Sequence, residues 1–229
     1  MIPLKDSNPC TCVPFVTIGL IAVNVAVFLY QASLGRELQG FVRAWGLVPA
    51  EVLGRPVTVL TSMFLHGGVV HVGGNMLYLW IFGDNIESAF GHLRFLGLYL
   101  VFGLAAAALH TAVDPGSGMP MVGASGAVAG VLGAYALLYP RARVLTAVFF
   151  GFFVRLVWIP AAFVLGLWFV LQLVSGLPAL SRAGGGVAWF AHVGGFAAGL
   201  ALALPLVRRV RAECAARERA ARRRPTFRM

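Results

Sequence analysis

Long hydrophobic runs separated by short polar segments set the pattern of this sequence. A helix needs about 20 apolar residues to cross the roughly 30 Å hydrocarbon core of a bilayer. Six runs come near that length and predict membrane-spanning helices, at about 14–32, 68–82, 95–110, 121–139, 158–174 and 187–207. The pattern therefore predicts an all-α polytopic membrane protein with six transmembrane helices.

Two of the intervening segments are too long to be simple turns. Residues 33–66 mix charged and apolar side chains, which predicts a structured first loop with an amphipathic helix lying at the membrane interface. Residues 144–157 are mostly apolar but contain Arg155, and Pro160 follows them. We expect an interfacial or re-entrant piece at about 144–156, before the fifth transmembrane helix.

Composition and charge agree with a membrane protein and orient it. The chain is 59% hydrophobic and 11% charged, whereas soluble domains are about 25% charged. Arginines follow the second and fourth predicted helices, and nine more lie between Arg208 and Arg228. Since basic residues stay on the cytoplasmic side, both termini are predicted to be cytoplasmic.

This charge distribution also bears on partners and on domain organisation. The basic segment directly follows an apolar helix, so we expect it to contact anionic lipid head groups of the bilayer and not nucleic acid. The sequence then divides into a cytoplasmic N-terminus at 1–13, one six-span domain at 14–207 and a basic cytoplasmic tail at 208–229.

Polar side chains inside the predicted helices are costly and therefore functional candidates, and four of them make up the short list. They are His71, Asn75, Ser125 and His192. The second, fourth and sixth helices all run from outside to inside, and His71, Ser125 and His192 each lie four or five residues into one of them. At 1.5 Å per residue, all three should lie roughly 6–8 Å below the outer surface. The sequence thus predicts a polar site at one depth.

Ser125 and His192 suit nucleophilic catalysis. Ser125 lies in Gly123-Ala124-Ser125-Gly126 at the beginning of a helix, where its unpaired backbone N–H and the helix dipole can stabilise an oxyanion. The flanking Gly123 and Gly126 would let a substrate backbone approach. His192 can accept the serine proton and later donate it to the leaving amine.

The remaining histidines and Asn75 complete the predicted site. His71 and Asn75 are spaced i, i+4 and share a helix face, so both can donate hydrogen bonds to the oxyanion. His66 lies off that face, and we expect it to be a structural or oxyanion-supporting group at the membrane edge.

Each motif alone also has a purely structural explanation. The Gly-rich stretch around Ser125 could be a small-residue helix contact, and His192 a packing histidine. Other membrane proteases are excluded by residues, because there is no H-E-x-x-H and every aspartate lies outside the predicted helices. We therefore expect no metal and no cofactor, and a Ser–His dyad without an acid. A transporter would predict internal repeats, which are not evident.

Several stretches are similar to the rhomboid family, in its compact bacterial six-span form. They are His66-x4-His71-x3-Asn75, Gly83-x3-Glu87-x6-Arg94-Phe95, Gly123-Ala124-Ser125-Gly126 and Ala191-His192-x-Gly194-Gly195-x3-Gly199. The resemblance implies a rhomboid-like helical bundle in the bacterial inner membrane. It implies an intramembrane serine endopeptidase with a Ser125–His192 dyad, and an oxyanion hole of Ser125, His71 and Asn75. Its substrates would be single-span membrane proteins.

The resemblance also implies how the helices are arranged. Gly195-x3-Gly199 would pack tightly against the fourth helix, Glu87 and Arg94 would brace a cytoplasmic turn, and the fifth helix with the loop at 177–186 would form a lateral gate and lid. Some relatives carry an aromatic residue one turn after the serine, where Ala129 stands here. The alternative function is that of an inactive rhomboid-like protein which binds or escorts membrane clients.

Overall fold

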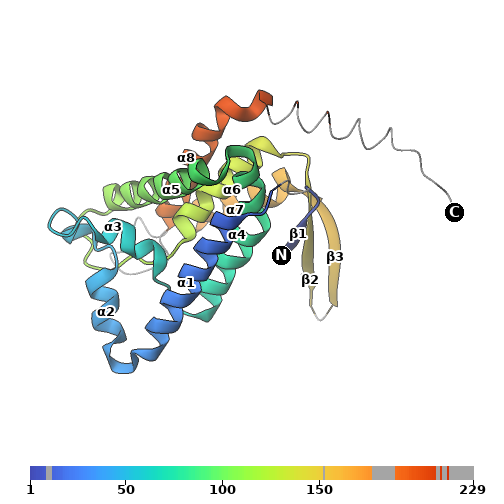
Figure 1. Ribbon diagram of the computed structural model, residues 1–229. Helices are drawn as coiled ribbons and strands as arrows, with labels where there is room; N and C mark the ends of the chain where they lie inside the picture. Colours follow the sequence, from blue (N-terminus) through green and yellow to red (C-terminus); the bar gives the residue numbers. More distant parts are fainter. Residues whose placement is uncertain (9–11, 152, 177–188, 210–211, 213–215, 217–229) are drawn as a thin grey trace.

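The computed structural model shows a helical bundle with a small β-sheet beside it (Figure 1). It describes residues 1–8, 12–151, 153–176, 189–209, 212 and 216. The main helices are α1 (Phe15–Ser33), α4 (Val69–Phe90), α5 (His92–Val113), α6 (Ser125–Leu138), α7 (Ala161–Gly176) and α8 (Trp189–Ala203). The predicted helical membrane fold is thereby confirmed.

The helices differ in their capacity to cross a bilayer. By length and composition, three described helical stretches could span one, namely Phe15–Ser33, His92–Val113 and Trp189–Arg209. Two further apolar helical stretches are shorter, Ser125–Leu138 and Ala161–Val174. Helix α4 carries Asp84 and Glu87 in its second half. The multi-pass architecture is clear, whereas the count of six spans stays a prediction.

The first loop is structured, as expected. It contains the short helices η1 (Gly35–Glu37), α2 (Leu38–Trp45), η2 (Pro49–Glu51), α3 (Thr58–Thr61) and η3 (Ser62–Phe64). Arg43 and Arg55 both pair with Glu51. A β-bridge between Leu47 and Met121 joins this loop to the segment that precedes α6. The loop therefore helps to hold the entry into α6.

A three-stranded antiparallel sheet contains the segment that was expected to be an interfacial or re-entrant piece, and its strands were not predicted. Its strands are β1 (Ile2–Asp6), β2 (Arg143–Phe150) and β3 (Phe153–Pro160), in the order β1-β2-β3. In the hairpin, Val144 pairs with Ile159 and Val148 with Arg155. The segment is rich in β-branched and aromatic residues, which favour strands. As a consequence α7 begins at Ala161 and not at Trp158.

Other helix boundaries also differ from the prediction, chiefly the end of α4 and the start of α6. Helix α4 continues to Phe90, where the sequence predicted a turn after residue 82. The polar residues in its second half that suggested a turn are buried inside the protein. Helix α6 begins at Ser125, and residues 121–124 approach it as a non-helical segment. The predicted lid at 177–186 and most of the basic tail lie outside the described residues.

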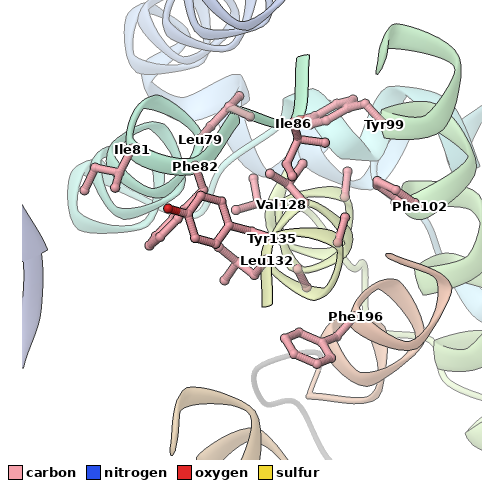
Figure 2. Close-up of a cluster of buried hydrophobic side chains, with 14 of the residues drawn as sticks. Leu79, Ile81, Phe82, Ile86, Tyr99, Phe102, Val128, Leu132, Tyr135 and Phe196 are labelled. Carbon is pink, nitrogen blue, oxygen red and sulfur yellow. The ribbon is translucent and has the colours of Figure 1, made fainter. Parts of the chain in front are cut away.

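Helix α6 forms the centre of the bundle. All its residues from Gly126 to Tyr135 are buried. Figure 2 shows side chains of α4, α5 and α8 gathered around it, among them Phe82, Phe102 and Phe196. A bundle that surrounds a short helix in this way can fix the position of its first residue.

Glycines allow α6 and α8 to pack with their backbones in contact. A Cβ atom at Gly195 would overlap the carbonyl oxygen of Gly126, and one at Gly199 would overlap that of Gly130. Small residues permit such close approach in membrane helices. The expected packing of Gly195 and Gly199 against the fourth predicted helix, α6, is therefore confirmed.

Candidate active site

Ser125 is the first residue of α6, so its backbone N–H has no acceptor within the helix. Gly123, two residues before Ser125, has a φ angle of +130°, a conformation that other residues rarely adopt. Its N–H donates to the carbonyl oxygen of Ser62 at 2.9 Å, which fixes the approach to the helix. The Ser125 side chain therefore projects from a rigid helix start.

His192 lies on α8 with its ring directed at Ser125. The His192 Nε2 and Ser125 Oγ atoms are 2.8 Å apart, a hydrogen-bond distance. The imidazole is 8% exposed. The glycine contact between α6 and α8 begins at Gly126, directly after Ser125, and at Gly195, three residues after His192, so it sets the distance between the two side chains.

His71 and Asn75 lie on α4 and face the same cavity. The Gly67 N–H donates to His71 Nδ1 at 3.3 Å, which places the ring hydrogen on Nε2. That edge of the ring lies over Gly123, since a Cβ there would be 2.8 Å from His71 Nε2. Asn75 is buried, and its Nδ2 has no hydrogen-bond partner among the described residues. Both side chains therefore have a donor available near Ser125.

These four residues line one cavity of about 840 Å³. Its walls also include Gly67, Gly68, Met121, Val122, Trp168 and Trp189. Polar groups are few and converge at one place in an otherwise apolar surface, as is typical of a ligand-binding cavity. The structure thus brings together the serine, both site histidines and the asparagine that the sequence singled out.

The three predicted supporting residues, Gly123, His66 and Gly126, lie outside the cavity lining. His66 is 3% exposed and packs edge-on against the His71 ring at 5.2 Å. The His66 backbone N–H donates to Gln31 Oε1 at 2.9 Å, and Gln31 Nε2 donates to the His66 carbonyl oxygen at 3.2 Å. Gly126 lies against Ala106 of α5, so its small size serves helix packing.

Sequence reasoning missed Gln172 of α7. Its Oε1 is 2.7 Å from His192 Nδ1, on the opposite side of the ring from Ser125. Trp168, one turn earlier, lies with its ring centroid 5.8 Å from that of His192. A polar residue within an apolar helix is a usable signal, and Gln172 was such a residue.

Comparison with known proteins shows the family of the chain. The rhomboid domain family matches residues 53–209, more than half of the chain and all of α4 to α8. The chain belongs to the rhomboid family and is a multi-pass membrane protein.

Individual relatives match over shorter stretches. "Rhomboid protein 1, mitochondrial" of Saccharomyces cerevisiae is 32% identical over 136 residues, 57% of this chain and 38% of the relative. "Rhomboid protease GluP" of Bacillus subtilis is 41% identical over 81 residues, 35% of this chain and 15% of the relative. "RHOMBOID-like protein 4" of Arabidopsis thaliana is 36% identical over 150 residues, 65% and 34% of the two chains. The matched stretches cover well under half of each of these relatives.

Proposed function

We propose that this protein is an intramembrane serine endopeptidase with Ser125 as nucleophile and His192 as general base. The observation that carries the proposal is the 2.8 Å separation of Ser125 Oγ and His192 Nε2 inside the cavity. A hydroxyl within hydrogen-bond reach of an imidazole base is the arrangement that nucleophilic acyl transfer requires. The name of one relative, a rhomboid protease, agrees with it.

The first half-reaction forms an acyl-enzyme. The Ser125 oxygen attacks the substrate carbonyl carbon while its proton moves to His192 Nε2, and the carbonyl π electrons move to the oxygen. The resulting oxyanion accepts hydrogen bonds from the Ser125 N–H, His71 and Asn75. When the tetrahedral intermediate collapses, the C–N bond breaks and His192 returns the proton to the leaving amine.

The second half-reaction consumes one water molecule. His192 takes a proton from the water as its oxygen attacks the ester carbonyl, and the same three donors stabilise the second oxyanion. The ester C–O bond then breaks, and His192 gives the proton back to Ser125. The products are a carboxylic acid and an amine, and the enzyme is regenerated.

The substrates we propose are single-span membrane proteins. A helix hides its peptide groups in internal hydrogen bonds, so a substrate segment must unwind before its carbonyl can reach Ser125. We further propose the bacterial inner membrane, with both termini cytoplasmic and the cavity open to the exterior. In support, the cavity lies at the N-terminal ends of α4, α6 and α8, and β1 contacts the opposite ends of α4 and α6.

Labelling with a fluorophosphonate probe tests the proposal. Purified protein in detergent should be labelled, and Ser125→Ala and His192→Ala should both abolish labelling. Ser33→Ala and His92→Ala are matched controls, because Ser33 is exposed beyond the cavity and His92 pairs with Glu87 at the other end of α4. Both controls should be labelled like wild type.

Two outcomes would contradict the proposal. A folded wild type that resists labelling would favour the alternative, an inactive family member that binds or escorts membrane clients. Labelling that survives Ser125→Ala would place the reactive nucleophile elsewhere. Cleavage of a single-span reporter protein reconstituted in vesicles then separates a protease from an enzyme that acts only on small esters.

A further inference from the structure

Gln172 is a buried amide on α7 whose two polar atoms both have partners. It is 8% exposed. Its Nε2 donates to the backbone carbonyl of Trp168 at 3.4 Å, and its Oε1 lies 2.7 Å from His192 Nδ1. If the amide were turned over, Oε1 would face the Trp168 carbonyl oxygen, and two acceptors would oppose each other. The Trp168 contact therefore keeps the oxygen directed at His192.

The direction of this amide determines which nitrogen of His192 carries hydrogen. An amide oxygen can only accept, so the hydrogen of the neutral ring must be on Nδ1. The lone pair is then on Nε2, the atom that faces Ser125 Oγ at 2.8 Å. This is the tautomer that a general base needs, because the opposite tautomer would present N–H to the serine.

We propose that Gln172 is the positioning residue of the dyad, holding the orientation and tautomer of His192. The inference rests on the proposed protease function and deepens it. Asp6 bonds to Asn85 at the end of α4 away from the cavity, where Asp84 also lies, and Ala129 has no ring to stack on the imidazole. Gln172 therefore takes the place of an orienting acid.

The role continues through the reaction. When His192 accepts the Ser125 proton, its Nδ1–H stays bonded to Gln172 Oε1, whose partial negative charge stabilises the imidazolium. Since Gln172 lies on α7 while the dyad lies on α6 and α8, full activity requires α7 to be packed against α8. The Phe169 ring, stacked on Phe196 of α8 at 4.4 Å, supports that packing.

The experiment compares Gln172→Leu with Gln172→Glu. Leucine fills a similar volume without an acceptor, whereas glutamate keeps an oxygen at the same reach. Fluorophosphonate concentration series separate the maximal labelling rate from the half-saturating concentration. Gln172→Leu should lower the maximal rate about 10-fold to 100-fold, part of what general-base catalysis contributes, and leave the half-saturating concentration unchanged. Gln172→Glu should restore most of the rate.

Leu171→Ala is the matched control on the same helix, because Leu171 is 53% exposed and does not line the cavity. It should leave the maximal rate unchanged. If Gln172→Leu does not fold, Gln172→Met replaces it in the same comparison with Gln172→Glu.

The outcomes separate this role from the protease function. If wild type is labelled at Ser125 and Gln172→Leu keeps the full maximal rate, Gln172 does not position His192 and the protease function stands. Equal losses in Gln172→Leu and Gln172→Glu would also overturn the role, because an acceptor would then make no difference. A folded wild type that is never labelled overturns both.

Discussion

At the scale of single residues, Asn75 provides the sharpest test of the oxyanion hole. Its buried Nδ2 has no hydrogen-bond partner among the described residues. An unsatisfied buried donor lowers the stability of the folded protein until an acceptor binds to it. Asn75→Ala should lower the maximal labelling rate about 100-fold to 1000-fold, the usual effect of losing one oxyanion donor. Its thermal unfolding temperature should match or exceed that of wild type. A parallel loss of stability and activity would instead indicate a packing role.

His192 makes activity depend on pH. Only the neutral imidazole can accept the Ser125 proton, and free histidine is protonated below about pH 6.5. The labelling rate should therefore fall on acidification with the slope of a single proton. His110 is a second titratable imidazole of the bundle, so the profile should be repeated in His110→Gln. A labelling rate that does not fall at any acidic pH at which the protein stays folded would count against His192 as base.

Most residues of the candidate site could be predicted from the sequence. Lipid makes every buried polar group costly, so the few that remain within apolar runs stand out, and co-directional helices place them at one depth. Gln172 was not predicted as a site residue, because only the packing of α7 decides which way its amide points. The position at which α6 begins was not predicted either, since residues 121–124 are apolar like the helix that follows them.

At the scale of elements, the close contact of α6 and α8 holds the dyad together. Gly199→Ala would place a methyl group on the Gly130 carbonyl oxygen, and neither backbone can yield without separating the helices. We expect a loss of about 1–3 kcal/mol in the free energy of unfolding, as overpacking typically costs, together with reduced labelling. Reversible unfolding in mixed detergent and denaturant measures it.

Gly97→Ala on α5 is the matched control, because a Cβ there has no neighbour within 4 Å. Alanine is the better helix former, so this variant should be as stable as wild type or more so. If both variants behaved alike, steric contact between α6 and α8 would not explain the glycines.

Strand formation was the least predictable part of the fold. A run such as Arg143–Pro160 is apolar enough to be read as membrane-associated, and short apolar runs do not distinguish helix from strand. What decides it is a distant segment, since β1 from the chain's beginning pairs with β2, with Ile2 opposite Ala147. Sequence periodicity within the run cannot reveal such a partner.

At the scale of the whole molecule, the bundle has two polar ends with different tasks. The cavity with Ser125 occupies one end. At the other, β1 is attached to α4 and α6 through Asp6, whose carboxylate accepts from Tyr135 Oη at 2.5 Å and from Asn85 Nδ2 at 3.0 Å. Glu87 of α4 similarly accepts from the N–H groups of Val16 and Thr17 at the start of α1. The second end therefore ties the N-terminal segments to the bundle.

Asp6 makes the stability of this second end depend on pH. Burial raises the pKa of Asp6 above its usual value, so folding favours the protonated carboxyl. The contribution of protonated Asp6 is complete below the unfolded pKa of about 3.9 and is lost as pH rises through the higher folded pKa. Asp6→Asn stays neutral and keeps an oxygen for Tyr135. It should match or exceed wild type in unfolding free energy at pH 7, and acidification should raise wild type relative to it. Because Asp6 lies away from the cavity, the labelling rate of the variant should not change. If the difference in unfolding free energy between wild type and variant stays constant with pH, the protonation of Asp6 is not coupled to folding.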